Sequence, residues 1–450
     1  MNTCWSNQYG APFVDSSRGL TGTGAVLIAN LMSTLSVARD NLAGHGVYPK
    51  DAPSILYKYD FIVVGAGSAG SVVASRLSEV PHWNILLLEA GGDPPLDTEI
   101  PLLFPTLQGT DIDWNYKTEP QDGMFLGMEG NRCPIPRGKV LGGSSSMNAM
   151  LYVRGSKKDY DDWAIAGNKG WDYESVLPYF KKSEDMRSEE VISIKNFSRY
   201  HNTGGYLSVE QLKTQDPYVL SVIKASEELG YHKVDDINRE EPYGFLESQG
   251  TLRNGTRCNT AKAFLGAAKN RPNLHVINLL VASDVLLPLP TLLNPKSRGK
   301  VQLKSSDPFE SPNIFAGFYT DPEDIETMIR AIRFYQKLAN TKVMKMLGAR
   351  LEHLDLPDCR KFSFDTREYW ICTLRHLSST VYHPVGTCKM GPSSDPEAVV
   401  SPKLKVYGVK RLRVADASIM PYILSGNTNA ATIMIGERAA DFIKEDWLNK

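Results

Sequence analysis

From residue 59 onward, apolar positions fall into short runs separated by a helical pattern. Phe61 to Val64 is entirely apolar and too short for a helix, so it predicts a buried parallel strand. Helical spacing follows from Ser71 to Ser78, and a second apolar run, Ile85 to Leu88, predicts the next strand. A strand, a helix and a strand in this order predict a βαβ unit within an α/β fold.

The same 3.6-residue spacing predicts helices further along the chain. Asp321, followed by Pro322, is the expected N-cap of a helix whose apolar face packs on a core. The other expected elements are a helix from Asp172 as N-cap to Asp185, helices at Tyr218 to Leu229 and Thr260 to Ala268, and strands starting at Asn273 and at Lys300.

Length and composition narrow the class of protein. A chain of 450 residues is too long for one ordinary core, so two domains are expected. Hydrophobic residues make up 42% and charged residues 22%, as in ordinary globular proteins. The formal net charge is −1 and no basic run stands out, so nucleic acid is excluded as a partner.

The cysteines and the N-terminal region leave the compartment open. The six cysteines are scattered without a C-x-x-C pair, so no metal site is expected. Two N-x-S/T tripeptides, at Asn196 and Asn254, would be glycosylated only on the secretory route. The apolar segment Gly24 to Ala38 is too short for a membrane span. Residues 1–57 therefore contain either a late secretion signal or a leader that packs on the domain, and localisation stays secreted or cytoplasmic.

The first candidate site is the turn between the first strand and the first helix. Gly65, Gly67 and Gly70 form a G-x-G-x-x-G pattern, which permits a tight turn, close approach to a pyrophosphate, and close helix–strand packing. Glu89 ends the second strand, where a carboxylate accepts hydrogen bonds from ribose hydroxyls. A glycine-rich turn can also be purely structural, but this context favours dinucleotide binding. The pattern alone does not separate FAD from NAD.

The second candidate site runs from Arg132 to Gly155. Its small residues, Gly142 to Ser146, allow backbone to approach a bulky ligand, and Arg137 and Lys139 supply charge. A solvent loop is the alternative, although a solvent loop seldom continues into an apolar run such as Ala149 to Val153. The composition favours a cofactor cradle.

Three motifs together resemble the glucose–methanol–choline (GMC) oxidoreductases, and within them the insect branch of FAD-dependent glucose dehydrogenase-like proteins. They are the βαβ fingerprint, KVLGGSSSMN at 139–148 and HPVGTC at 383–388. The resemblance implies a Rossmann-like FAD-binding domain and FAD rather than NAD. It also implies oxidation of the CH–OH group of a small alcohol or sugar, with electrons passing to a quinone-like acceptor or oxygen. An NAD-dependent dehydrogenase would leave the second and third motifs unexplained.

The resemblance also assigns the catalytic residues. A lone histidine is more often structural, but His383 matches the family's catalytic base, and an imidazole titrates in the range that proton transfer requires. Asn427 falls where the family carries a second hydrogen-bond partner of the substrate oxygen; Asn429 fits a looser alignment, and both also suit N-capping of the last helix. Cys388 is expected to be a small buried residue. The expected cofactor-binding residues are Gly65, Ala66, Gly67, Ser68, Ala69, Gly70, Glu89, Ala90, Val140, Gly142, Gly143, Ser144, Asn148, Asp416, Ala417 and Thr428.

A family segment is missing from the chain. After Asn278 the sequence passes through LLVASDVLLPLP straight to Thr291-Leu292-Leu293-Asn294-Pro295, which resembles a segment that comes much later in the family. We place the junction between Ile277 and Pro290; a splice variant, a faulty gene model or a true loss would each produce it. The expected regions are a leader (1–57), an N-terminal FAD-binding region (58–282, with a substrate-domain insert at about 183–247), a truncated α+β substrate-binding region (288–382) and a C-terminal return to the FAD domain (383–450). The alternative to an active enzyme is a protein that keeps the fold but no longer turns over substrate.

Overall fold

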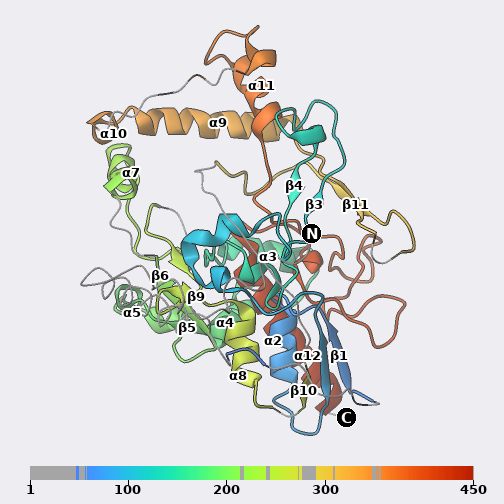
Figure 1. Cartoon of the computed structure of the whole chain (residues 1–450). Coiled ribbons are helices and arrows are strands. Elements are labelled where there is room, and N and C mark those ends of the chain that lie inside the picture. The colour runs from blue at the N-terminus through green and yellow to red at the C-terminus, as the bar shows by residue number, and fades with distance from the viewer. Residues whose placement is uncertain are drawn as a thin grey trace, which may run out of the picture. The chain divides into compact units, whose positions relative to one another are not determined.

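The computed structural model describes residues 47–49, 56, 58–212, 217–239, 244–271, 273–275, 290–307, 310–346, 351, 353 and 356–448 (Figure 1). The apolar segment Gly24 to Ala38 lies outside these ranges, and so does the expected junction except for Pro290. No helix within the described ranges has the length and apolar character that crossing a membrane requires.

The predicted βαβ unit is confirmed. Strands β1 (Phe61–Val64), β2 (Ile85–Leu88) and β10 (Leu274–His275) form a parallel sheet in the order β1-β2-β10. Phe61 pairs with Ile85 and Val64 with Leu88, so β1 and β2 are paired over their whole length. Helix α2 (Gly70–Leu77) connects them and packs against both strands. The carboxyl ends of β1 and β2 therefore meet at the glycine-rich turn.

The prediction that β1 is buried is wrong for one of its faces. Phe61 and Val63 pack against the main hydrophobic core, whereas Ile62 is 60% and Val64 82% exposed. Leu88, the partner of Val64 on β2, is 38% exposed. An apolar strand is buried on both faces only if another layer covers each face, and the described residues supply such a layer on one side. We call Ile62, Val64 and Leu88 the open sheet face.

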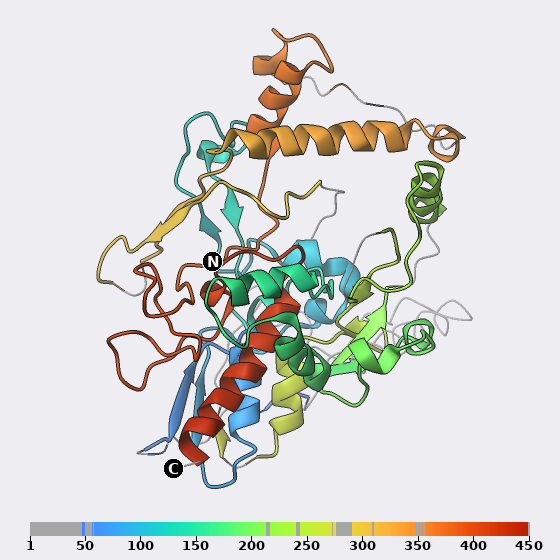
Figure 2. The ribbon, with the colours of Figure 1, turned by 180° about the vertical axis from the view of Figure 1, so that it is seen from behind.

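The long C-terminal helix α12 (Thr428–Leu448) lies beside α2 and α4 (Tyr173–Ser183), as Figures 1 and 2 show from opposite sides. The approach to α2 is close, since a Cβ on Gly436 would lie 2.9 Å from the carbonyl oxygen of Ala69. A buried ion pair joins the two helices: Arg76 Nε and Nη2 each donate to Glu437 carboxylate oxygens at 2.8 Å. This pair fixes the middle of α12 against the C-terminal end of α2.

Glu437→Ala should lower the free energy of unfolding by roughly 3–5 kcal/mol, because within the described ranges it leaves buried Arg76 with Glu79 as its one charged partner. The check is urea unfolding of the purified chain. Lys444→Ala is the matched control on the same helix: Lys444 makes a partly exposed pair with Glu79 at 2.9 Å, and its loss should cost less than about 1 kcal/mol. Equal losses in the two variants would refute a structural role for the Arg76–Glu437 pair.

The helices predicted by apolar spacing are present. Helix α4 is capped by Asp172, whose side chain accepts from Ser175 N at 3.0 Å, and α7 (Pro217–Glu228) matches its predicted range. Helix α9 (Pro322–Ala339) is capped by Asp321, and its face Ile325, Met328 and Ile329 packs in a separate small core. The segment predicted as one helix after Thr260 is a π-helical turn, η6 (Ala261–Leu265), followed by α8 (Gly266–Ala268).

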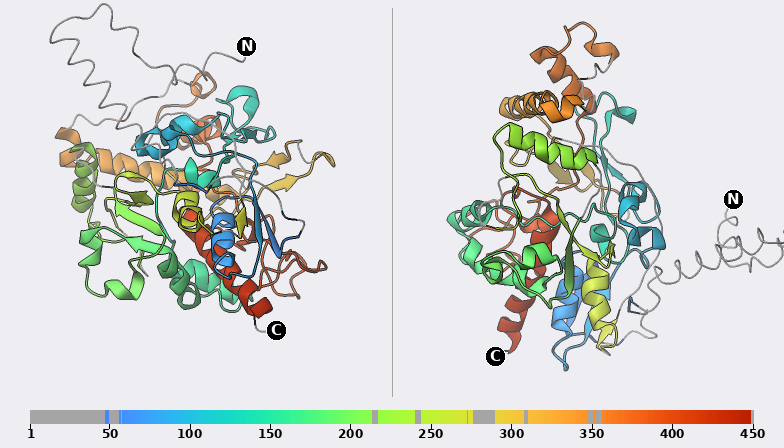
Figure 3. Two further views of the ribbon diagram at one scale, coloured as in Figure 1. Left: turned by 60° about the horizontal axis from the view of Figure 1, so that its bottom comes forward. Right: turned by 90° about the vertical axis from the view of Figure 1, so that its left-hand side faces the viewer.

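The region from 290 to 377 carries few strands. Strand β11 (Lys300–Gln302) pairs antiparallel with β12 (Asn313–Phe315) alone, and its three residues are exposed. Helix α7 contacts α9 and α10 (Lys342–Met346), as both views of Figure 3 show. The alternating pattern at 300–304 therefore does form a strand, but no described sheet covers its apolar side chains.

The remaining elements are short and connect these parts. The helical ones are η2 (Leu96–Glu99), η3 (Pro101–Leu107), η4 (Glu129–Asn131), η5 (Gly143–Ser146), α3 (Lys157–Ile165), α5 (Glu189–Ile192), α6 (Phe197–Tyr200), η7 (Pro357–Cys359), α11 (Arg367–Leu377) and η8 (Ala417–Ile419). The strands are β3 (Tyr116–Lys117), β4 (Pro134–Ile135), β5 (Glu184–Met186), β6 (Leu207–Gln211), β7 (Gln249–Gly250), β8 (Leu252–Arg253) and β9 (Thr256–Arg257). Strands β5, β6 and β7 form a second three-stranded sheet.

Candidate functional site

The glycine-rich turn packs directly against the second predicted motif, although 75 residues separate Gly67 from Gly142. Gly142 N donates to the carbonyl oxygen of Ala66 at 2.9 Å. A Cβ on Gly143 would lie 2.7 Å from Gly67 Cα, so the two backbones touch where neither carries a side chain. Gly65 has φ +94° and open space where a Cβ would be. The fold thus builds a surface of bare backbone, which suits close approach of a pyrophosphate.

Alanine substitutions at Gly70 and Gly67 should distinguish a glycine that the fold of the turn requires from a glycine that ligand binding requires. In Gly70→Ala the new Cβ would lie 1.9 Å from the carbonyl oxygen of Gly65, so the turn must move and we expect at least the ~1–3 kcal/mol cost of overpacking. In Gly67→Ala the nearest protein atom is 4.0 Å away, so the chain should fold while FAD binds more weakly. Thermal unfolding and flavin content check both; unchanged flavin content in Gly67→Ala would count against a pyrophosphate at this turn.

Glu89 lies at the end of β2 and faces the same turn. Its Oε2 accepts from Ala66 N at 2.7 Å and its Oε1 from Gly91 N at 3.0 Å. Burial raises the pKa of this carboxyl, and the backbone hydrogen bonds oppose the rise. Gly91 allows the close approach of the 139–148 segment, since a Cβ there would lie 1.9 Å from Lys139 O. The carboxylate, the glycine turn and the second motif therefore meet at one edge of the sheet, whereas the neighbouring Ala90 is exposed.

The second motif begins with Val140, buried among Leu107, Ile112 and Met147, and is anchored by a residue that sequence reasoning missed. Arg257 is fully buried; its Nε donates to Thr98 O at 2.6 Å and its Nη1 to Asn148 O at 2.7 Å and Asn148 Oδ1 at 2.9 Å. Burial lowers its pKa to about 10. Its Nη2 has no hydrogen-bond partner among the described residues. A buried donor without a partner is costly, so this position fits an acceptor that a ligand supplies.

His383 is held between the two residues that begin the last helix. Asn427 Nδ2 lies 3.0 Å from His383 Nε2, and Thr428 Oγ1 lies 3.0 Å from Nδ1. An amide nitrogen only donates, so Nε2 accepts and the ring proton lies on Nδ1, toward Thr428. Burial lowers the pKa of His383 to about 4, with a further contribution from the charge of Arg137. At neutral pH the imidazole is uncharged and Nε2 has a lone pair that can take a proton.

The two asparagines left open by the sequence have different surroundings. Asn427 contacts His383, whereas Asn429 Oδ1 accepts from Ser68 Oγ at 2.6 Å and ties α12 to the glycine turn. Asp416 caps η8 by accepting from Ser418 N at 2.7 Å, and Ser418 O accepts from Cys388 N at 2.9 Å. Cys388 is a free thiol that is half-buried rather than buried, because it lies in a turn beside the exposed Thr387.

The sequence singled out Arg137 as a source of charge, but it did not reveal the contact that Arg137 makes with the residue before His383. Its Nη2 donates to the carbonyl oxygen of Tyr382, a residue with φ +69°, and its backbone N donates to Asp113 Oδ1 at 2.8 Å. The Tyr382 hydroxyl donates to Gln108 Oε1 at 3.1 Å. Positive φ is unfavourable for tyrosine, so these contacts hold the residue before His383 in a conformation that it would not adopt alone.

Arg137→Met should raise the pKa of His383, because it removes the nearby positive charge that favours the neutral ring. With His383 as the expected base, which accepts a proton only when neutral, activity is present above its pKa and is lost as pH falls through it. The acid limb of kcat/KM should therefore lie near pH 4 in the wild type and move toward, but not reach, 6.5 in the variant, since burial remains. Lys139→Met is the control: Lys139 lies over the Trp114 ring, and its loss should leave the limb in place. An unmoved limb in Arg137→Met would exclude this coupling.

Comparison with known proteins identifies the family to which the fold belongs. Two family models described as GMC oxidoreductase match residues 59–305 and 295–436. Glucose dehydrogenase (FAD, quinone) of Drosophila pseudoobscura pseudoobscura and of Drosophila melanogaster are each 34% identical over 551 residues, covering 87% of this chain and 87% of theirs. Ecdysone oxidase of Bombyx mori is 28% identical, over 89% of this chain and 84% of its own.

Among solved structures, pyridoxine 4-oxidase from Mesorbium loti superposes with a TM-score of 0.75 at 23% identity, over 87% of this chain and 100% of its own. A fungal aryl-alcohol oxidase does so with a TM-score of 0.71 at 19% identity, over 88% and 100%. These likenesses show the fold. The aligned region of 551 positions also exceeds the 450 residues of this chain, so a long internal stretch of the Drosophila proteins has no counterpart here.

Proposed function

This chain belongs to the GMC oxidoreductase family, and from that premise we propose that His383 is the base with which it oxidises a primary alcohol or a sugar hydroxyl. It is an FAD-dependent oxidoreductase with a small-molecule alcohol or sugar substrate and a small-molecule electron acceptor. FAD, when bound, accepts the hydride that leaves the substrate carbon. We propose a quinone-like compound as the acceptor, because the Drosophila relatives are named for FAD and quinone.

The observation that carries the role of His383 is its hydrogen-bonding pattern. Among the described residues its Nε2 is paired with the side chain of Asn427 alone, which can turn from the ring to a substrate oxygen, while Thr428 holds Nδ1–H. In this role His383 takes the hydroxyl proton and Asn427 orients the hydroxyl oxygen. The low pKa of His383 supports the assignment, because a buried, uncharged imidazole is ready to accept the proton.

For the cofactor we propose the residues that the two packed motifs expose. The turn Gly65 to Gly70, with Glu89 and Ala90, would hold the adenosine diphosphate, and Glu89 would exchange its bond to Ala66 N for a ribose hydroxyl. The segment from Val140 to Asn148 would lie along the flavin, with Asp416, Ala417 and Thr428 completing the site. The unpartnered Nη2 of Arg257 beside this segment supports the presence of a ligand acceptor.

We divide the chain accordingly. The FAD domain would consist of residues 58–182, 248–282 and 383–450, and a truncated substrate domain would take the remainder after the leader. Packing of α12 on α2 supports the return of the C-terminal segment to the FAD domain.

A second candidate is a GMC-fold isoform that binds FAD but turns over poorly. The open sheet face favours it, since Val64 is 82% exposed on a strand whose sequence is entirely apolar. The exposure of strand β11 also favours the poorly active isoform. Both are the consequences expected when an internal segment is absent.

The test is a panel of sugars and primary alcohols, each offered to the FAD-loaded chain with a quinone and, separately, with oxygen. The proposal predicts substrate-dependent quinone reduction for at least one sugar or alcohol, and a slower rate with oxygen. FAD-loaded chain that reduces neither acceptor with any member of the panel would support the impaired isoform instead. Faster reduction of oxygen than of quinone would overturn the acceptor assignment alone.

A further inference from the structure

Two exposed asparagines begin N-x-S/T tripeptides that the proposed reaction does not use: Asn196-Phe197-Ser198 and Asn254-Gly255-Thr256. We propose that both asparagines carry N-linked oligosaccharides and that the chain therefore folds in the oxidising compartment of the secretory route. The geometry of each asparagine and a disulfide elsewhere in the fold carry this inference independently.

Asn254 lies at the tip of a tight hairpin. Strands β8 and β9 pair Arg253 with Thr256, and Asn254 (φ +53°) and Gly255 (φ +74°) form the two-residue turn between them. Asparagine suits such a turn for conformational reasons alone. However, its side chain is engaged only through Oδ1, which accepts from Arg187 Nη1 at 3.3 Å. Its Nδ2, the atom that a glycan would modify, makes no hydrogen bond with any described residue, so substitution there breaks no contact.

Asn196 precedes the short helix α6, again with positive φ (+68°). An asparagine at this position normally caps the helix by accepting a backbone N–H, but the Asn196 side chain makes no such bond. Both Asn196 and Ser198 are exposed, so the acceptor and its hydroxyl are accessible together. A glycan at either tripeptide would project from a turn without displacing packed side chains.

Transfer of an oligosaccharide to asparagine requires no group from the FAD site. A bond forms between asparagine Nδ2 and the anomeric carbon of an oligosaccharide, and the bond from that carbon to the diphosphate of a lipid-linked donor breaks. The amide loses one proton, and the lipid diphosphate leaves with the electron pair of the broken bond. Such donors are used on the lumenal side of the secretory route, where the third-residue hydroxyl is required.

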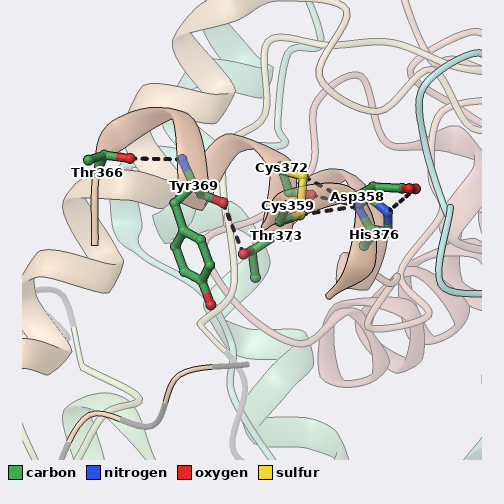
Figure 4. The surroundings of a disulfide bond; sticks show 7 residues. All are labelled: Asp358, Cys359, Thr366, Tyr369, Cys372, Thr373 and His376. Atoms are coloured by element: carbon green, nitrogen blue, oxygen red, sulfur yellow. Dashed lines mark hydrogen bonds and ion pairs between the residues drawn. A yellow bond between two sulfur atoms is a disulfide. The ribbon is translucent and has the colours of Figure 1, made fainter. Parts of the chain in front are cut away.

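A disulfide provides the second observation (Figure 4). Cys359 at the end of η7 and Cys372 in α11 are bonded, with their Cα atoms 5.7 Å apart, and the bond pins η7 to α11. When the Cys359–Cys372 bond forms, its two thiols lose two electrons and two protons, and a second disulfide that exchanges with them is reduced to two thiols. Stable disulfides are typical of secreted proteins and rare in the cytosol. Sequence reasoning found no signal for this pair, because the two cysteines are 13 residues apart.

The side chains around this disulfide could instead bind a metal ion if the disulfide were reduced. His376 in α11 has its Nδ1 3.8 Å from Cys359 Sγ and 3.9 Å from Cys372 Sγ, and its Nε2 lies 3.1 Å from Asp358 Oδ2. In a reducing compartment the side chains of Cys359, Cys372 and His376 could together hold a metal ion. Of the three remaining described cysteines, Cys133 and Cys258 are buried and Cys388 is half-buried; burial raises the pKa of the Cys258 thiol, which slows exchange with the disulfide.

The experiment expresses the full chain with its own N-terminus in insect cells and treats it with an N-glycan-releasing amidase. We expect the untreated chain to migrate as a glycoprotein and treatment to leave aspartate at positions 196 and 254, read by peptide mass spectrometry. Non-reducing peptide mapping should recover Cys359 linked to Cys372. A chain without glycan, whose Cys359 and Cys372 are free thiols or bind zinc, would overturn the proposal.

Paired variants distinguish the two glycosylation sites. They are made in a chain that is secreted by means of an added signal peptide. Asn254→Gln and Thr256→Ala should each remove one glycan, and Asn196→Gln and Ser198→Ala should each remove the other. The hydroxyl variants keep the turn asparagines, so they remain informative if an asparagine variant misfolds. A secreted chain whose mobility is unchanged by both variants of one tripeptide would overturn the assignment of that site.

Discussion

His383→Ala is expected to lower the rate of substrate-dependent flavin reduction by roughly 10²–10⁴-fold, the factor that a positioned general base contributes. Within the described part of the chain, the side chains of Asn427 and Thr428 both contact the His383 ring, which lies where the last helix begins. FAD content should barely change, because none of the hydrogen bonds between the two glycine motifs involves His383. Stopped-flow reduction under anaerobic conditions, expressed per bound flavin, is the measurement.

His376→Ala is the matched control for this prediction. His376 is buried in α11 and bonds to Cys372 O at 2.9 Å and to Asp358, so its loss can affect stability. It should not alter the rate per bound flavin. If His383→Ala retains near-normal reduction, or if both variants lose rate equally, the base is another group.

Restoring the missing segment should have the second large effect. The chain as it stands exposes Ile62, Val64 and Leu88 on one sheet and Val301 (46%) and Leu303 (87%) near β11. A few hundred Å² of apolar surface left open forgoes several kcal/mol at ~25 cal/mol per Å². That is comparable with the ~5–15 kcal/mol stability of a whole domain. We therefore expect the 450-residue chain to aggregate readily and to hold little flavin.

The measurement inserts, between Ile277 and Pro290, the corresponding segment of the Drosophila melanogaster relative. Flavin bound per chain and the temperature of aggregation should both rise. The control replaces Ile62 and Val64 by threonine in the original chain, which should delay aggregation without restoring flavin. A soluble, fully flavinated 450-residue chain would show that the open sheet face is tolerated.

Local sequence patterns predicted the parts of the fold that local interactions determine. The strand–turn–helix around Gly65 and Gly70 was predictable because a short apolar run and fixed glycine spacing specify it. The Asp172 and Asp321 caps were predictable for the same reason, since each bonds within three residues. The meeting of Gly67 with Gly143 could be expected only through the family resemblance.

What the sequence did not reveal depends on contacts between distant segments. Arg137 and Arg257 gain their roles by reaching Tyr382 and Asn148 across the fold, and a single arginine carries no local signal of that. The burial of β1 was predicted from its composition, whereas burial depends on whether another segment covers each face. The Cys359–Cys372 bond was missed because spacing alone does not specify a pair.

The central claim is that this GMC oxidoreductase oxidises an alcohol or sugar with His383 as base. It is tested most directly by adding substrate anaerobically to the soluble, flavin-bearing fraction and following the visible flavin absorption. We expect the absorption to bleach in the wild type and to persist in His383→Ala on the same timescale. Persistence in the wild type with every sugar and alcohol offered, or equal bleaching in both proteins, would contradict it.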